Sequence, residues 1–212
     1  MLQLTRSGAA WRAPEADLAA LADAFSARHC VRLRGFVEPA LLRLIQSQIA
    51  RARFRQRTHD GIGTDQTMEA NACAGLLHFL VNDARVYGLV ETLSGCRPIR
   101  SFHGRVYRRL PGRHHDAWHT DLIENRRVGL SINLSAAAYE GGAFEIRDAR
   151  TERPFDAIAD VGTGDAVLFR IAPGLEHRVT ELHGTSPRTA FAGWFRAKPD
   201  YLGGLRAEWR RT

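Results

Sequence analysis

Two histidines and one aspartate have the residue types and spacing needed to hold a metal ion. His119 and Asp121 lie two residues apart, so on a β-strand both side chains would point to the same face. His177 follows later, at the start of an alternating apolar and polar segment. Two imidazoles and one carboxylate form the facial set that binds iron(II) and leaves adjacent coordination positions open. The three residues therefore predict a metal site of catalytic type.

The His-x-Asp pair alone is a weak signal, because the sequence contains it twice. The second match, His114-His115-Asp116, follows Pro111-Gly112-Arg113 and indicates a loop. Asp121 is instead followed by the apolar pair Leu122-Ile123, which is typical of a strand in a core. We therefore place the metal at His119 and Asp121. Four of the remaining histidines are expected in loops: His59, His103, His114 and His115.

A wider order of motifs makes the signal specific. Downstream of Asp121 come Tyr139-Glu140-Gly141-Gly142-Ala143-Phe144, then Gly164-Asp165-Ala166-Val167-Leu168-Phe169, then His177 and finally Arg188. In this order, about residues 100–197 resemble the 2-oxoglutarate/Fe(II) dioxygenase superfamily, specifically its prolyl-hydroxylase-like branch. Upstream, the run from Gly35 to Pro39 is similar to the usual start of that branch.

The resemblance implies a double-stranded β-helix that uses Fe(II) with the co-substrates 2-oxoglutarate and O₂. It implies that His119, Asp121 and His177 are the catalytic metal ligands, and that Arg188 binds the distal carboxylate of 2-oxoglutarate. A guanidinium suits that role because it can hold a carboxylate through two parallel hydrogen bonds. On a strand Arg188 would share its face with Ala190, whose small side chain leaves room for a co-substrate.

Three further positions are proposed on weaker grounds. Tyr107 matches a tyrosine of the family that contacts the co-substrate near the metal. Asn133 stands where the family often has a tyrosine near the distal carboxylate, a departure that puts the hydrogen-bond partners of the co-substrate in doubt. Arg105 is a candidate for binding an anionic group of the substrate. Trp118 and Trp194 are expected to belong to the core.

The pattern of the remaining sequence predicts one α+β domain. Apolar residues at helical spacing predict helices over residues 14–28, 39–54, 72–81 and 83–93. From residue 99 onward, turn signals separate about eight short strand-like segments, which is typical of a jelly roll. The expected strands are 101–108, 118–123, 128–135, 143–147, 154–159, 166–170, 177–182 and 189–197.

This organisation predicts that residues 1–212 form a single oxygenase domain. Residues 1–98 would form mainly helical support with the N-terminal helices packed on one sheet, and residues 99–197 the double-stranded β-helix (jelly roll or cupin-like) core. The polar, glycine-containing stretch 58–71 is expected to be a loop that acts as a lid over the site.

Composition excludes several other classes of protein. The three cysteines show no metal-type spacing, which favours a reducing, cytoplasmic setting without disulfides. No stretch is apolar enough to predict a membrane span or a signal peptide. The net charge of +7 invites a nucleic-acid partner, but nearly all the basic residues are arginines dispersed along the chain, which argues against one.

The sequence thus favours a hydroxylase that acts on an unactivated C–H bond and releases succinate and CO₂. An acidic ligand at Asp121 favours hydroxylation, because halogenating relatives have a small residue there. The substrate is expected to be a small molecule or an amino-acid-like group, free, carrier-tethered or peptidyl. Two alternatives stay open: a cupin-like metal-binding or sensing protein without oxygenase activity, and a protein that acts on nucleic acid. The oligomeric state is not predicted.

Overall fold

The computed structural model describes residues 1–12, 17–59, 61–113, 116–123 and 125–198. Four α-helices occur in this part of the chain: α1 (Leu18–Arg28), α2 (Pro39–Ala50), α3 (Ala72–Val81) and α4 (Ala84–Ser94). The strands of its first half are β1 (Leu2–Thr5), β2 (Gly8–Trp11), β3 (Cys30–Leu33), β4 (Phe54–His59), β5 (Gly63–Met68) and β6 (Ser101–Arg109). The later strands are β7 (Arg126–Asn133), β8 (Glu140–Gly141), β9 (Phe144–Asp148), β10 (Pro154–Ile158), β11 (Ala166–Arg170), β12 (Leu175–Val179), β13 (Leu182–His183) and β14 (Arg188–Arg196).

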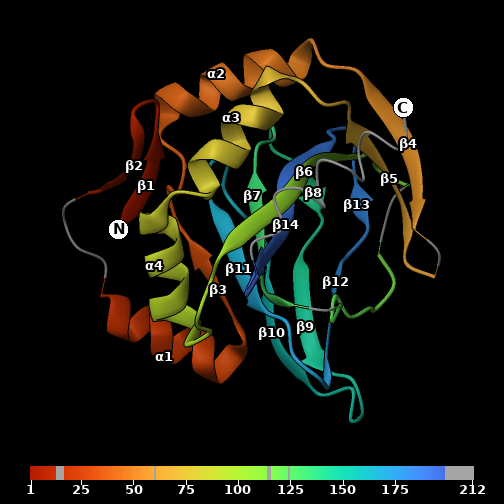
Figure 1. Ribbon diagram of the computed structural model, residues 1–212. Coiled ribbons are helices and arrows are strands. Elements are labelled where there is room, and N and C mark those ends of the chain that lie inside the picture. The colour runs from red at the N-terminus through yellow and green to blue at the C-terminus, as the bar shows by residue number, and fades with distance from the viewer. Residues whose placement is uncertain (13–16, 60, 114–115, 124, 199–212) are drawn as a thin grey trace.

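Two antiparallel sheets form the β core (Figure 1). The larger sheet has seven strands in the order β3-β11-β7-β14-β6-β5-β4, and the smaller one has the order β10-β9-β12. Apolar side chains of both sheets meet in one cluster that includes Phe144 and Ile146 of β9 with Val167 and Phe169 of β11. This arrangement is the double-stranded β-helix that the sequence predicted.

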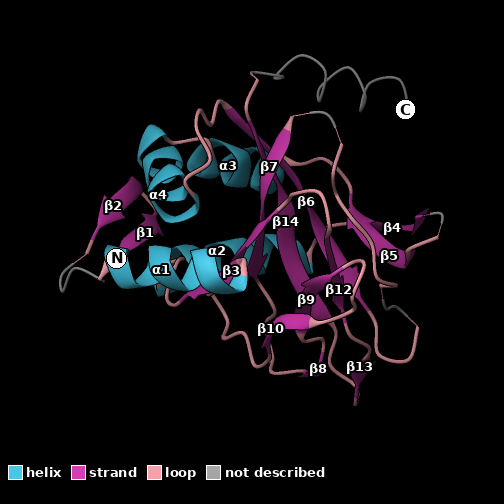
Figure 2. Cartoon of the chain, turned by 90° about the horizontal axis from the view of Figure 1, so that it is seen from below, coloured by secondary structure: helices cyan, strands magenta, loops and turns pink. Residues whose placement is uncertain are grey.

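The helices pack on the other face of the larger sheet, as Figure 2 shows. A second apolar cluster joins them to it, including Phe25 of α1, Ile45 of α2 and Leu77 of α3. Three of the helices begin at a side chain that accepts a hydrogen bond from the first-turn backbone: Asp17, Asn71 and Asp83. Such caps satisfy amides that have no partner within the helix. The expected helical support on one sheet is thus confirmed.

Strand β14 shows how alternation separates packing from function. Phe191 and Phe195 are fully buried in the cluster shared with the helices. Arg188, Ala190 and Ala192 point to the opposite face and line the cavity between the sheets. Because successive side chains of a strand point to opposite faces, the helix-facing phenylalanines fix which residues reach the cavity.

The predicted lid loop over residues 58–71 is wrong. Most of this stretch belongs to the hairpin of β4 and β5, which pairs with β6 through Gln66 and Thr67 and extends the larger sheet. Alternation is hard to recognise here because the segment is polar on both faces. The hairpin still contributes to the cavity, since Arg57, His59 and Asp65 line it.

Smaller departures concern the ends of the chain's elements. The N-terminal hairpin of β1 and β2 was not predicted. Helix α1 begins at Leu18, after its cap Asp17; residue 14, where the predicted helix begins, lies outside the described residues. None of the helices in the described ranges is long and apolar enough to cross a membrane.

Candidate metal centre

The two histidines and the aspartate predicted as ligands come together at one end of the cavity. One ligand atom from each of His119, Asp121 and His177 lies within 4.8 Å of the others. His177 Nε2 is 3.3 Å from Asp121 Oδ2. Two imidazoles and a carboxylate at such spacing form a donor set that suits a divalent iron ion.

The segment around His119 is not the strand that the sequence predicted. His119 and His177 form an isolated antiparallel bridge, in which each backbone N–H donates to the other carbonyl, over 3.1 and 3.0 Å. No strand continues through residues 120–123. The single bridge is enough to fix the pair, with ring centroids 4.4 Å apart. Asp121 reaches the cluster from the irregular backbone that follows.

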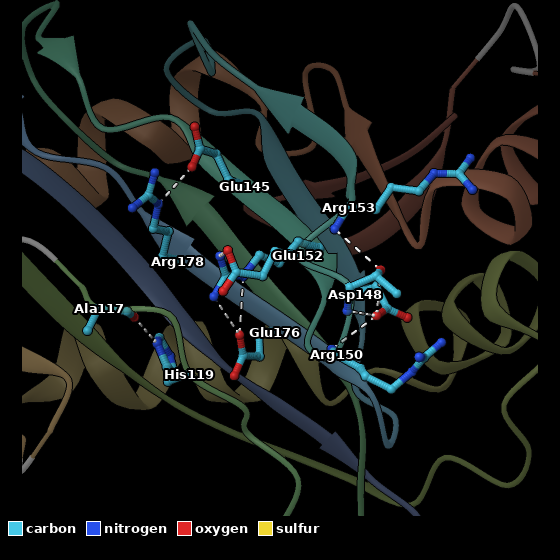
Figure 3. Close-up of polar contacts among 11 residues, drawn as sticks. Ala117, His119, Glu145, Asp148, Arg150, Glu152, Arg153, Glu176 and Arg178 are labelled. Carbon is cyan, nitrogen blue, oxygen red and sulfur yellow. Dashed lines mark hydrogen bonds and ion pairs between the residues drawn. The ribbon is translucent and has the colours of Figure 1, made fainter.

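The ring of His119 is held in the tautomer that suits a metal ligand. Its Nδ1 lies 2.8 Å from the carbonyl oxygen of Ala117, seen as a dashed line in Figure 3. A carbonyl only accepts, so Nδ1 carries the proton and Nε2 keeps its lone pair for a metal. Burial and the neighbouring His177 lower the pKa of His119, which keeps the imidazole neutral.

Two donors orient the carboxylate of Asp121. Trp194 donates from Nε1 to Oδ2 over 2.6 Å, and Arg126 donates from its guanidinium to Oδ1 over 3.2 Å. Arg126 in turn stacks on the Trp194 ring, 3.6 Å from its centroid. Burial opposes ionisation of Asp121, but the contacts with His177 and Trp194 outweigh it and hold the pKa of Asp121 below its usual value.

We expect Trp194→Phe to weaken iron(II) binding by about tenfold, because the carboxylate of Asp121 loses the donor that fixes its orientation. The substitution keeps an aromatic ring at the cavity wall, so folding should be little affected. Metal titration of the apo-protein would measure the loss. An unchanged iron affinity would show that the indole hydrogen bond does not position the ligand. Trp194 packs against the apolar cluster of the two sheets, as expected, and in addition lines the cavity and bonds Asp121.

Trp118 holds the His119 segment against the outer side of the smaller sheet. Its ring lies between two guanidinium groups, those of Arg147 at 4.2 Å and Arg178 at 4.5 Å. Each arginine is fixed by a glutamate: Arg147 by Glu176, and Arg178 by Glu145, a pair that Figure 3 shows. Trp118 is thus partly exposed and clamped by cations, and it is not the core residue that the sequence predicted.

We expect Trp118→Leu to lower iron(II) affinity several-fold and to lower the melting temperature by only a few degrees, because the clamp positions a metal ligand and contributes little to the core. Exposed cation–π contacts are worth about 0.5–1 kcal/mol each. Metal titration and thermal unfolding of the same preparation separate the two effects. A lower melting temperature with unchanged metal affinity would contradict the positioning role.

A cavity of about 460 Å³ extends from the cluster between the two sheets. Its polar lining comes from several strands: Arg57, His59, Asp65, His103, Arg105, Tyr107, Arg109, Asp116, Thr120, Arg126, Ser131, Arg188 and Arg196. Phe144 and Phe169 pack against each other and both contact the His177 ring, so they form one apolar wall beside it. The cavity is large enough for small molecules.

Arg188 is a buried cation in this cavity, and its surroundings favour the binding of an anion. The residue is only 7% exposed. Its guanidinium donates to the Ser131 hydroxyl over 3.2 Å, and its Nε has no hydrogen-bond partner. No carboxylate of the described residues forms an ion pair with it. A buried cation without a counter-charge is costly, so the site fits the carboxylate of a dicarboxylic co-substrate.

Tyr107 and Arg105 also line the cavity, where the sequence placed them. Burial, followed by the charge of Asp65, raises the pKa of Tyr107 well above its usual value. The phenol therefore stays protonated and can donate a hydrogen bond. Tyr107 is the direct cross-strand neighbour of Ala190, whose side chain leaves space above it.

Asn133 was predicted to bind the co-substrate, but its side chain does not line the cavity. It is 2% exposed, its amide donates to the carbonyl of Val161 over 2.6 Å, and its side-chain oxygen accepts from the backbone of Ser135. The side-chain amide of Asn133 thus connects β7 to the backbone at Val161 and Ser135. Ser131, two residues earlier on the same strand face, takes the position beside Arg188.

Several other sequence expectations change with the structure. Leu122 and Ile123 are 43% and 53% exposed, so they are not core residues, and Ile123 lines the cavity. His59 and His103 lie in β4 and β6 and not in loops. His114 and His115 fall outside the described residues.

Three residues of the site were missed in the sequence. The indole of Trp194 has the same strand parity as Arg188, which was a usable signal. Ser131 shares the face of Asn133, again by alternation. Arg126 gave no signal, because its contact with Asp121 depends on the irregular backbone after His119.

Comparison with known proteins agrees with this geometry. Residues 103–196 match the model of the 2OG-Fe(II) oxygenase superfamily. No curated protein sequence matches the chain. Among solved structures, a prolyl-4-hydroxylase from Pseudomonas putida is 20% identical with a TM-score of 0.64, over 86% of this chain and 100% of that one.

Two further structures show the same fold with bound ligands. A prolyl hydroxylase from Trichoplax adhaerens, in complex with a hypoxia-inducible-factor peptide fragment, is 12% identical with a TM-score of 0.63, over 85% of this chain and 89% of that one. HygX from Streptomyces hygroscopicus, with nickel, 2-oxoglutarate and hygromycin B bound, is 14% identical with a TM-score of 0.60, over 84% and 85%.

At these identities the structural likeness concerns the fold, and it agrees with the prolyl-hydroxylase-like resemblance of the sequence. The family match covers the strands that carry the cluster and Arg188. Residues 103–196 are thus similar to the 2OG-Fe(II) oxygenase superfamily, an enzyme class that uses Fe(II), 2-oxoglutarate and O₂, and their His-Asp-His cluster fits that class.

Proposed function

We propose that this oxygenase hydroxylates an unactivated C–H bond of its substrate, with His119, Asp121 and His177 as the ligands of its iron. Residues 99–197 would be the catalytic core of a single domain, and residues 1–98 its support. The observation that carries the proposal is the pairing, in one cavity, of this donor cluster with the buried, uncompensated guanidinium of Arg188.

The residues around the cluster have distinct roles in this proposal. Bound iron(II) supplies the chemistry that couples O₂ activation to decarboxylation of 2-oxoglutarate to succinate and CO₂. Arg188 holds the distal carboxylate of the co-substrate with its guanidinium fork, beside the Ser131 hydroxyl. Tyr107 donates a hydrogen bond from its protonated phenol. Phe144 and Phe169 keep water from the centre.

Substrate entry is assigned to the side of the cavity formed by the hairpin of β4 and β5. Arg105 on the neighbouring strand β6 faces the same space and is a candidate contact for the substrate. The carboxylate of Asp121 supports hydroxylation over halogenation, because it fills the coordination position that a halide would need. The substrate class includes small molecules and peptidyl groups, the two kinds of ligand bound by the structurally similar proteins.

The test is turnover of 2-oxoglutarate by the iron-loaded enzyme under ¹⁸O₂, without added substrate. We expect slow, iron-dependent formation of succinate that carries one labelled oxygen atom. Apo-protein supplies the baseline, and 2-oxoglutarate with free iron(II) controls for chemistry in solution. Unlabelled succinate, or none above the controls from folded protein, would favour a cupin-like metal-binding protein without oxygenase activity.

A further inference from the structure

The cavity has more positively charged side chains than are needed to bind iron(II) and 2-oxoglutarate. Among its described lining residues are six arginines and three aspartates. One of the aspartates, Asp121, belongs to the metal cluster, and Asp116 pairs with Arg109 at 2.6 Å. The two charges of iron(II) and of the 2-oxoglutarate dianion cancel each other. The loaded site therefore keeps an excess of cations, which attracts an anionic ligand.

Arg57 is a lining arginine that forms no hydrogen bond or ion pair with the described residues. It lies on β4, is half-buried and faces the cavity. No described residue gives it a hydrogen bond or ion pair. Its cross-strand neighbour Asp65 is instead bonded to the His59 ring at 3.1 Å and to the Thr67 hydroxyl. The guanidinium of Arg57 is therefore available to a ligand.

A second donor without a partner lies two strands away from Arg57, on the far side of β5. Arg109 of β6 bonds Asp116 through one guanidinium nitrogen, and its other terminal nitrogen, NH1, is buried without a partner. The phenol of Tyr107, two residues away on the same face, feels the charges of both Arg57 and Arg109. Three potential donors thus surround one region of the cavity.

Arg188 and Arg57 lie on strands that are not neighbours. Their strands, β14 and β4, are separated by β6 and β5, so the two backbones lie about 14 Å apart along the sheet. A 2-oxoglutarate molecule held by Arg188 would therefore have its distal carboxylate far from the backbone of Arg57. The charge of Arg57 on the hairpin side of the cavity suits a second anion.

We propose that the substrate of this oxygenase is an anion, with a carboxylate or a phosphate-like group that Arg57 holds on the hairpin side of the cavity. This inference rests on the proposed function, since it names the substrate class of the same site. Arg57 would bind the group in the bidentate geometry that guanidinium offers to both kinds of oxyanion. The reacting C–H bond would then lie between this anchor and the metal cluster.

The first experiment measures anion binding by isothermal titration calorimetry on anaerobic protein loaded with iron(II) and saturating 2-oxoglutarate. The probes are sulfate, acetate and acetamide, which stand for a phosphate-like group, a carboxylate and its neutral analogue. We expect binding of sulfate or acetate and none of acetamide. The oxyanion that binds more tightly distinguishes the phosphate-like source from the carboxylate.

Three variants make the result specific to Arg57. Arg57→Gln should weaken anion binding by about tenfold or more, the size of a lost charge-assisted hydrogen bond. Arg57→Lys keeps the charge and should retain part of the affinity. Arg55→Gln is the matched control: Arg55 lies on the same strand, is 74% exposed at its side chain, pairs with Glu69 and does not line the cavity. It should bind the probes as the parent does.

The outcomes separate this inference from the proposed function. Equal binding by parent and Arg57→Gln, or no binding of either anion by the parent, would overturn the anionic subsite. The 2-oxoglutarate requirement of the same samples should not change in Arg57→Gln. If the parent bound no 2-oxoglutarate while anion binding still depended on Arg57, the oxygenase proposal would fail and the subsite would stand.

Discussion

Replacing Arg188 with methionine is expected to raise the 2-oxoglutarate concentration needed for half-saturation by about 100-fold or more. The guanidinium is the buried cation that faces the co-substrate, with Ser131 as its protein partner. Losing a bidentate charged contact costs about 3 kcal/mol or more, since each hydrogen bond to a charged group contributes about 1.5–3 kcal/mol. Titration of the iron-loaded variant with 2-oxoglutarate measures the change.

The same substitution should not destabilise the protein in the absence of 2-oxoglutarate. Methionine fills a similar volume and removes a buried charge that has no carboxylate partner among the described residues, so the melting temperature should stay equal or rise. Arg188→Lys provides the control, because it keeps the charge without the fork and should lose less affinity. A large fall in stability with unchanged 2-oxoglutarate affinity would mean that Arg188 is structural.

Removal of one ligand is expected to abolish the iron site. His119→Ala leaves two of the three donors and should therefore lower iron(II) affinity by at least about 100-fold. The backbone bridge to His177 does not use the ring of His119, so the local fold can persist in the variant. Metal analysis after dialysis, with calorimetric titration of iron(II), measures the loss.

His59→Gln is the matched control for this experiment. His59 lines the same cavity but does not belong to the cluster of ligand atoms. It should retain iron in the parent's stoichiometry. Equal iron content in His119→Ala and the parent would place the metal elsewhere and remove the basis of the mechanism.

Much of the fold followed from local pattern. Strand β11, helix α3 and strand β14 were predicted to within a residue or so, because each is rich in apolar residues and is bounded by turn signals or polar residues. The hairpin of β4 and β5 was missed because both of its faces are polar, and sequence periodicity has no contrast to detect.

The grouping of His119, Asp121 and His177 was predicted from the sequence, but the backbone that brings them together was not. Asp121 reaches the cluster from an irregular segment that a single bridge at His119 holds. The contact of Asp121 with Trp194 joins residues distant in sequence, and the contact with Arg126, five residues away, depends on the irregular backbone between them, so neither follows from a regular strand pattern. The prediction that Asn133 binds the co-substrate is wrong, because its buried amide donates to the backbone carbonyl of Val161.

The most direct test of the central claim is anaerobic titration of the apo-protein with iron(II) and then 2-oxoglutarate, followed by visible absorption. If His119, Asp121 and His177 hold the metal and Arg188 the co-substrate, the parent will develop the weak charge-transfer band of chelated 2-oxoglutarate. The band will be absent in His119→Ala and will need far more 2-oxoglutarate in Arg188→Met. A folded parent without the band, or a band that persists unchanged in both variants, would contradict the account.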